Sequence, residues 1–150
     1  MMGTLTASQI DDLLREQKVG RIGCCDKGKP YVVPVIFARS GHYIYCQSRE
    51  GRKIRTLRAN PEICFQVDVI QDLANWRSVT VFGRYEEMKT PKQQEEVHLI
   101  MHERFAPIRT GEQISHRPKD SRPPEVVEKQ PKAVYFRFRI LEQSGRFEKN

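Results

Sequence analysis

The sequence predicts a mainly β fold: an antiparallel barrel, closed or nearly closed, with a few peripheral helices. Six or so strand-like segments follow one another as a meander, and helical segments lie between them without the strand-helix-strand alternation of a parallel sheet. The length of 150 residues, 38% of them hydrophobic, suits one domain of ordinary size over residues 1–150. Nothing in the composition indicates a second domain.

The first expected element is a short amphipathic helix over residues 8–17. Residues 6–9 resemble a capping box, in which a threonine and a glutamine side chain each satisfy a backbone amide at the helix start. Ile10, Leu13 and Leu14 then form a narrow apolar stripe. We expect this stripe to pack against the sheet.

Strand signals recur along the rest of the chain, where β-branched and aromatic residues alternate with polar ones between turn residues. The expected strands cover residues 19–25, 31–38, 42–47, 63–69, 77–87 and 133–141. Gly83 marks a bend in the fifth of these strands. The last strand has a clean alternation, and residues 145–147 are expected to lead out of it into a polar tail.

Pro34 lies inside the second expected strand. Proline cannot donate a hydrogen bond to a neighbouring strand, so this strand must lie at an edge or carry a bulge there. Irregular backbone next to Val35, Ile36 and Phe37 would leave amides available for a ligand.

A basic helix is expected from Arg52 until Asn60 and Pro61 end it. Arg52 and Lys53 fall in its first turn, where their positive charges oppose the helix macrodipole. A bound phosphate between these cations and the free amides would remove the conflict. A solvated basic helix, with Arg55 and Arg58 facing water or nucleic acid, is equally compatible with this segment.

A third helix is expected from Thr90, which precedes a proline and a capping glutamine, to about Arg104. It would bury Val97, Ile100 and Met101. Residues 106–132 then contain five prolines among charged residues, so we expect a proline-rich loop or flap.

The formal charge of +7 and the pI near 9.4 favour an anionic partner, which on charge alone is a nucleic acid, an acidic protein or a phosphorylated cofactor. No apolar run approaches 18 residues, and residues 1–10 lack the features of a signal peptide. We therefore expect a soluble, cytoplasmic protein without a membrane partner.

Cysteine and histidine residues give little sign of a metal site. The four cysteines contain no C-x-x-C pair, and we expect them to be reduced and mostly buried. His98 and His102 lie four residues apart on the expected helix, but no third ligand accompanies them. His116, in the expected loop, is interpreted as an ordinary exposed histidine. We predict no metal.

Taken together, the motifs and their order resemble the pyridoxamine-phosphate-oxidase-related flavoproteins, and most closely their nitroimidazole-resistance-like branch. The resemblance covers residues 5–87 well and the final strand loosely. It is carried by residues 20–23 (GRIG), 30–37 (PYVVPVIF), 45–48 (YCQS), 51–53 (GRK), 60–61 (NP), 75–79 (NWRSV) and Gly83.

The resemblance implies an FMN-binding split β-barrel that forms a homodimer with FMN at the subunit interface. It places the FMN phosphate on Arg52 and Lys53, with Ser48 nearby, in agreement with the electrostatic argument. It also implies two stretches that contact the flavin ring. These stretches are Val35, Ile36 and Phe37, through their backbone, and Trp76, Arg77 and Ser78.

The function that follows is FMN-dependent oxidation or reduction of a small molecule with a separate electron donor, with no catalytic side chain assigned. The substrate-phosphate residues of the parent oxidase are not found, so oxidation of pyridoxine phosphate is not predicted. One alternative is a small basic barrel that binds nucleic acid, and another is a barrel that holds haem or a deazaflavin. The nucleic-acid surface would comprise Arg49, Arg52, Lys53, Arg55 and Arg58, with Phe37, Tyr43 and Trp76 as stacking groups.

Overall fold

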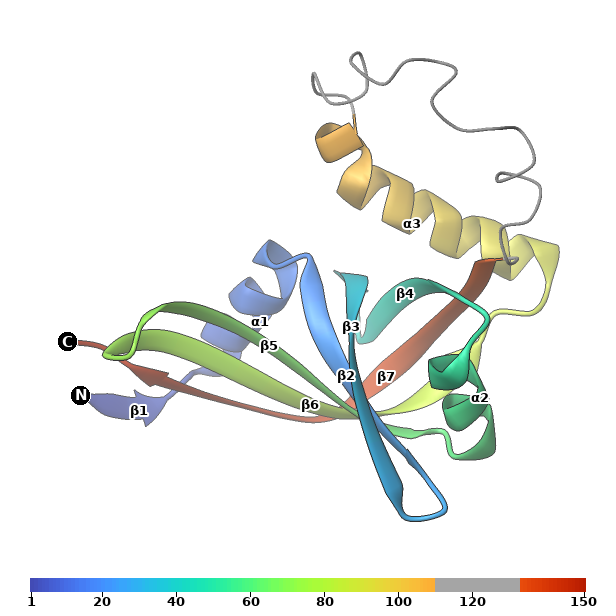
Figure 1. Ribbon diagram of the computed structural model, residues 1–150. Helices are drawn as coiled ribbons and strands as arrows, with labels where there is room; N and C mark the ends of the chain where they lie inside the picture. The colour runs from blue at the N-terminus through green and yellow to red at the C-terminus, as the bar shows by residue number, and fades with distance from the viewer. Residues whose placement is uncertain (110–132) are drawn as a thin grey trace, which may run out of the picture.

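A computed structural model describes residues 1–109 and 133–150 (Figure 1). This part of the chain contains seven strands and three helices. In chain order they are β1 (Met2–Thr4), α1 (Ala7–Glu16), β2 (Val19–Asp26), β3 (Lys29–Ser40), β4 (Tyr43–Arg49), α2 (Arg52–Ala59), β5 (Glu62–Asp72), β6 (Asn75–Glu87), α3 (Pro91–Arg109) and β7 (Ala133–Glu148).

The strands form one antiparallel sheet that closes on itself. The order across the sheet is β1-β7-β4-β3-β2-β5-β6, and β6 also pairs with β7. Six strands therefore complete a ring, while the short β1 is added to the end of β7. The predicted antiparallel barrel with peripheral helices is confirmed, and it has the split-barrel form.

Strand β7 is longer than the sequence predicted. We expected it to end at Leu141, but it continues to Glu148 and pairs there with both β6 and β1. Polar residues 142–144 interrupt the alternation from which the strand was predicted. Ladder hydrogen bonds to neighbouring strands and the packing of Phe147 against the core continue the strand past them. The prediction of a polar tail was therefore wrong.

The β2–β3 hairpin turns at Lys27 and Gly28, which both have positive φ values, of 52° and 77°. Along this hairpin Pro34 pairs with Arg21 of β2. The pairing of β3 with β4 begins only at Phe37, so Pro34 faces an open edge on its other side. This confirms the edge position that its missing amide required.

Gly83 lies at a register shift between β6 and β7. A side chain at this position would come within 2.5 Å of the carbonyl oxygen of Arg139. The predicted bend is thus a bulge at which β7 approaches β6 too closely for a Cβ atom.

Helices α1 and α3 begin as predicted. Thr6 and Gln9 form the expected capping box, and Thr90 and Gln93 cap α3 in the same way. The predicted end of α3 at Arg104 was too early, because the helix continues to Arg109 and Phe105 packs against the protein. The helix thus takes in 106–109, the start of the expected proline-rich loop, and residues 110–132 lie outside the described residues.

The main core fills the barrel between α1, α2 and the sheet. Phe65 packs between two other aromatic rings of this core. Its ring meets Phe37 edge-on with centroids 4.9 Å apart, and its centroid lies 5.3 Å from that of Phe138. A second cluster, which includes Val97 and Met101, joins α3 to the outer side of the sheet. Among the described residues no helix combines the length and the apolar character needed to span a membrane.

Candidate functional site

The corner between β4 and α2 carries the predicted phosphate site. Gly51 is the N-cap of α2 and provides no side-chain hydrogen bond, and no acidic residue lies in the first turn. The amides of that turn therefore lack a side-chain acceptor from the cap. Arg52 and Lys53 occupy the first turn as predicted, and an added Cβ at Gly51 would meet nothing within 4 Å.

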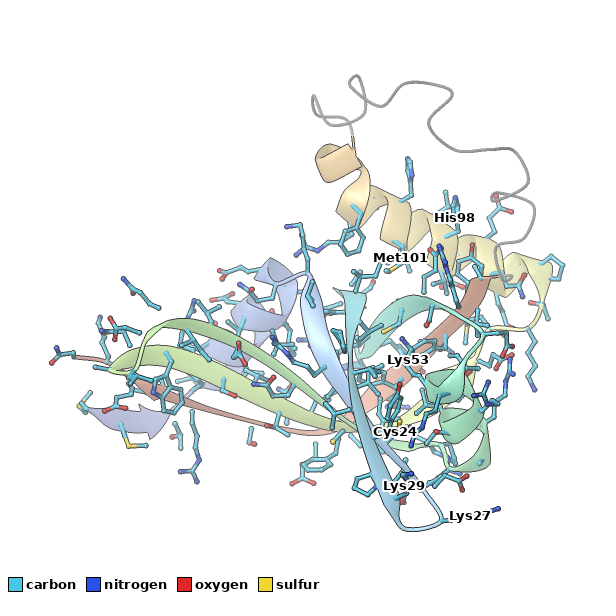
Figure 2. The ribbon with its side chains drawn as sticks, viewed as in Figure 1. Cys24, Lys27, Lys29, Lys53, His98 and Met101 are labelled. Atoms are coloured by element: carbon cyan, nitrogen blue, oxygen red, sulfur yellow. The ribbon has the colours of Figure 1, made fainter. Side chains whose placement is uncertain are left out.

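Lys53 is half-buried beside two thiols. Burial lowers the pKa of its ammonium group, and the nearby thiols of Cys46 and Cys24 oppose this shift to a smaller extent. Figure 2 shows Lys53 and Cys24 near each other beside α2. Among residues 1–109 and 133–150 no carboxylate forms an ion pair with Lys53. A half-buried cation without a counter-ion is a site that an anion would stabilise.

Arg52 is exposed on the neighbouring side of the same turn. Its guanidinium carbon lies 4.4 Å from the centroid of the Tyr31 ring, a cation-π contact that directs it along the outside of the β2–β3 hairpin. Ser48 precedes Arg52 by four residues and lies near the end of β4. Its Oγ donates to the carbonyl of Arg49 at 3.4 Å. All three predicted phosphate residues thus belong to one corner.

The β3 stretch lies next to this corner. Val35 and Phe37 bury their side chains, whereas Ile36 is 37% exposed. The amide of Phe37 donates to the carbonyl of Lys18 on the β2 side, so by alternation the amide of Ile36 points towards the open edge. Because Phe37 pairs with Cys46, the neighbour of Lys53, the edge and the phosphate corner adjoin.

The second predicted flavin stretch lies elsewhere. Trp76 and Arg77 are at the start of β6, near the chain termini and at the opposite end of the barrel from α2 (Figure 1). The indole Nε1 of Trp76 donates to Glu148 at 3.2 Å, and Ser78 accepts from Gln66 at 3.1 Å. Strands β5 and β2 separate β6 from β3. One chain therefore does not bring the two flavin stretches together.

Trp76 and Arg77 line a cavity of about 520 Å³. It lies between β5, β6, the start of α1 and both chain termini, and Phe147 and Leu5 contribute apolar walls. Sequence reasoning missed this cavity, because it depends on β1 and on the extension of β7. The only signal for it was the apolar Phe147 beyond the polar interruption.

Histidine and cysteine residues form no metal centre in the described part of the chain. The rings of His98 and His102 stack on α3 with centroids 6.2 Å apart, and His116 lies outside the described residues. All four cysteines are free thiols. Cys24 and Cys46 are buried as predicted, but Cys64 is exposed, and the expectation of burial was wrong for it. Its side chain points outward over Gly23, which has no Cβ to cover it.

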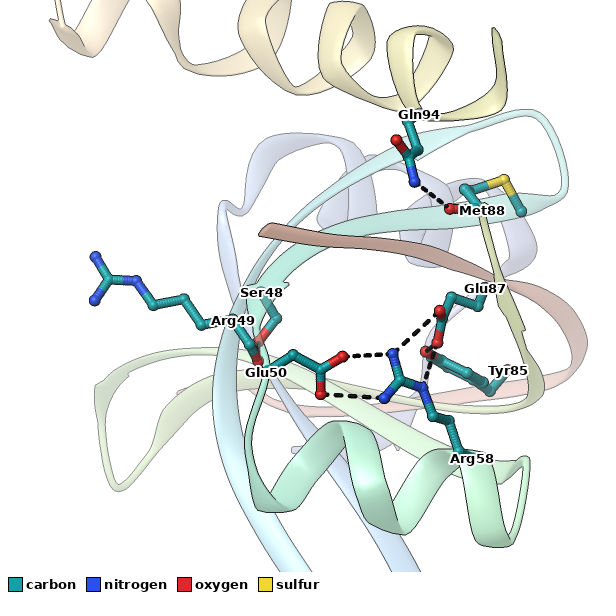
Figure 3. Close-up of polar contacts among 8 residues, drawn as sticks. All are labelled: Ser48, Arg49, Glu50, Arg58, Tyr85, Glu87, Met88 and Gln94. Carbon is teal, nitrogen blue, oxygen red and sulfur yellow. Dashed lines mark hydrogen bonds and ion pairs between the residues drawn. The ribbon is translucent and has the colours of Figure 1, made fainter. Parts of the chain in front are cut away.

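Two residues of the alternative nucleic-acid surface are not available for such contacts in the described structure. Phe37 is fully buried in the core and has no face to offer a base. Arg58 is engaged by two carboxylates, Glu50 at 2.6 Å and Glu87 at 2.7 Å (Figure 3). These ion pairs could not be predicted from local patterns, because Arg58 and Glu87 are 29 residues apart and meet only in the fold.

Comparisons with known proteins agree with this architecture. The chain is similar to a FAD-binding protein from Mesorhizobium loti, with 30% identity, a TM-score of 0.77 and 99% of each chain covered. It shares its fold with a candidate 5-nitroimidazole antibiotic resistance protein from Bacteroides thetaiotaomicron VPI-5482, with 18% identity, a TM-score of 0.69, and 98% of this chain and 89% of that one covered.

An uncharacterized protein of Rhizobium meliloti (strain 1021) is 40% identical over 70 residues, which are 47% of this chain and 46% of that protein. The chain thus matches less than half of the length of this curated relative. The family model described as pyridoxamine 5'-phosphate oxidase matches residues 6–146, nearly the whole chain. The chain belongs to the pyridoxamine 5'-phosphate oxidase family.

Proposed function

We propose that this protein binds FMN and acts as an FMN-dependent oxidoreductase on a small molecule. The observation that carries the proposal is Lys53, a half-buried cation without a carboxylate partner in the described structure, at the uncapped start of α2. With Arg52 it forms a two-cation corner next to an open strand edge. A flavin phosphate at the corner would neutralise the two cations, and the flavin ring would lie along the open edge of β3.

The charge of the corner favours FMN over other flavins. The phosphate monoester of FMN carries a charge near −2, which matches two cations and the helix dipole. The phosphates of FAD are diesters, and each carries a single charge. The similar protein from Mesorhizobium loti is a FAD-binding protein, so FAD is the competitor that the experiment must include.

The separation of the two flavin stretches supports a homodimer. In one chain the α2 corner and the Trp76 cavity lie at opposite ends of the barrel. A second copy could place its Trp76, Arg77 and Ser78 against the flavin that the first copy holds at Arg52 and Lys53. A complete site would then contain residues of both subunits.

The redox chemistry would be that of the flavin, which accepts electrons from a donor and passes them to a substrate. The chain would contribute binding and tuning. The Ile36 amide at the open edge can donate a hydrogen bond, and the positive charge of Arg77 can stabilise negative charge on a nearby ring. The cavity of about 520 Å³ beside Trp76 provides space for a small substrate.

Direct titration tests the cofactor. Flavin fluorescence is followed as the protein is added to FMN, FAD or riboflavin under identical conditions. We expect FMN to bind most tightly, and riboflavin, which lacks the phosphate, at least tenfold more weakly because its charge-assisted hydrogen bonds are missing. Equal affinities for FMN and riboflavin would contradict the phosphate assignment. Tighter binding of FAD than of FMN would show that FAD is the cofactor.

A complementation experiment tests the shared site. Protein with Lys53→Ala and protein with Arg77→Ala are each expected to bind FMN weakly. After the two are mixed and subunits exchange, each mixed dimer would contain one site with both residues intact. Recovery of tight binding at half of the sites in mixed dimers supports a site shared between subunits. No recovery, despite proven exchange, would contradict a site shared between subunits.

A further inference from the structure

We propose that Arg58 is a positioning residue for the phosphate corner: it draws the Glu50 carboxylate away from the start of α2 and so keeps the corner open to an anion. The inference rests on the proposed function, because the anion in question is the FMN phosphate. Arg58 itself lies in the last turn of α2 and does not belong to the corner.

Arg58 holds two carboxylates with one guanidinium group (Figure 3). Its Nη2 and Nη1 donate to the two oxygens of Glu50 at 2.6 and 3.1 Å. Its Nε and Nη2 donate to the two oxygens of Glu87 at 2.7 and 3.1 Å. Both pairs are bidentate, an arrangement that fixes orientation as well as distance.

The position of Glu50 explains why it must be held. Glu50 directly precedes Gly51, the N-cap of α2. A carboxylate at the start of a helix is attracted by the unpaired amides and by the positive end of the dipole. If it were unrestrained, Glu50 would compete with a phosphate for the same amides and would neutralise Arg52 or Lys53. Bound to Arg58, its two oxygens instead accept hydrogen bonds from the guanidinium group of a residue in the last turn.

Glu87 provides the fixed end of this arrangement. Its side chain is only 17% exposed, against 44% for Glu50. Glu87 also accepts a hydrogen bond from the hydroxyl of Tyr85 at 2.7 Å. The hydrogen bonds from Arg58 lower the pKa of Glu87, so this anchor stays charged at neutral pH. Arg58 is thus tied to the end of β6, and Glu50 is the more exposed partner that it restrains.

The exposure of the pair separates this role from folding. The side chains of Arg58 and Glu50 are 42% and 44% exposed. Exposed ion pairs contribute little to the stability of a fold, because water screens them and ordering their side chains costs entropy. Changing Arg58 should therefore leave the protein folded, and an effect on anion binding can be measured.

The experiment compares FMN and riboflavin affinities for the full chain and four variants. The variants are Arg58→Gln, Glu50→Gln, the double variant with both changes, and Arg137→Gln as a matched control. Arg137 also pairs with a glutamate at the end of β6, Glu86 at 2.9 Å, but in the described structure it forms no hydrogen bond or ion pair with α2. Thermal unfolding of every variant is recorded in parallel.

We expect Arg58→Gln to weaken FMN binding about tenfold while riboflavin binding changes less than twofold, because only the phosphate competes with Glu50. Adding Glu50→Gln should restore most of the lost FMN affinity. Arg137→Gln should bind FMN as the wild type does. Rescue by removal of a second charged residue is the result that a merely structural role of Arg58 would not give.

Three results would overturn the inference. Wild-type FMN affinity in Arg58→Gln would show that Arg58 does not position the corner. A loss shared equally by FMN and riboflavin, or one that Glu50→Gln fails to rescue, would show a general structural effect. If the wild-type protein itself binds no FMN, the proposed function fails first, and the inference fails with it.

Discussion

Lys53 lies beside the fully buried thiol of Cys46, and Cys46 pairs across the sheet with Phe37. This relationship connects three segments that are distant in sequence: the start of α2, the middle of β4 and the open edge of β3. An anion at Lys53 and a flat ring along β3 would therefore be neighbours.

Replacing Lys53 should weaken FMN binding without unfolding the protein. Loss of one charge-assisted contact to the phosphate is expected to raise the dissociation constant about tenfold to a hundredfold in Lys53→Ala. The pair Arg52→Ala with Lys53→Ala should have a larger effect. Fluorescence titration measures the affinities, and circular dichroism confirms the fold. Unchanged affinity in the folded double variant would remove the phosphate from this corner.

The half-buried charge of Lys53 should make stability depend on alkaline pH. Burial lowers the pKa of Lys53 in the folded protein, so the unfolded chain keeps its proton to higher pH. Between the lowered pKa and the ordinary lysine value of about 10.4, the free energy of unfolding gains a favourable contribution as pH rises. At pH values below this window the lysine is charged in both states, and burying the charge lowers the free energy of unfolding by its full amount.

Lys53→Met isolates this contribution, since the methionine keeps much of the chain length without the charge. Without an anion, the variant should match or exceed the wild type in unfolding free energy at pH 7, by up to about 1 kcal/mol. The difference should shrink above pH 10. With saturating FMN the wild type should become more stable than Lys53→Met, because ligand binding stabilises only the protein that binds it. Urea unfolding measures each value, and a variant clearly less stable than the wild type at pH 7 without ligand would refute the expectation.

Gly83→Ala should destabilise the barrel where β6 meets β7. The added Cβ would lie 2.5 Å from the Arg139 carbonyl oxygen and 2.9 Å from the Phe138 ring, so the backbone must move. We expect a loss of about 1–3 kcal/mol in the free energy of unfolding. Gly51→Ala is the comparison, because its Cβ meets nothing within 4 Å, and its cost should stay below about 1 kcal/mol. Equal losses in the two variants would contradict the bulge geometry.

The cysteines should differ sharply in reactivity. Cys64 is exposed, whereas Cys46 is fully buried and burial raises the pKa of its thiol. The thiolate is the reactive form, so in the native protein Cys64 should react first with a disulfide reagent and Cys46 last. Cys64→Ser should remove the fastest phase of the reaction. If Cys64→Ser removes a slower phase instead, the Cys64 thiol is covered in solution.

Much of the fold could be predicted from sequence because local signals agreed with it. The capping residues Thr6 and Thr90 fixed two helix starts, and Pro34 required the edge that β3 has. The extension of β7 could not be predicted, because its polar residues are held by ladder partners far away in the sequence. The short β1 exists only because that extension is there to pair with it.

The candidate site divides in the same way. The positions of Arg52 and Lys53 in the first turn of α2 could be predicted, because cations that oppose a helix dipole are a conflict that can be recognised in a sequence. Sequence patterns leave Arg58 facing water or, in the alternative function, nucleic acid. Its partners Glu50 and Glu87 come from a loop and from another strand, so no local pattern predicts them. Local patterns therefore predicted the charged corner but not the contacts that organise it.

The visible absorption spectrum of the purified protein tests the central claim most directly. It is recorded as isolated and again after addition of FMN and removal of the unbound excess, with the flavin released by denaturation and identified. The account predicts retained flavin peaks with about one FMN per chain. A colourless protein that retains no added flavin, or one with the Soret band of haem, would contradict it.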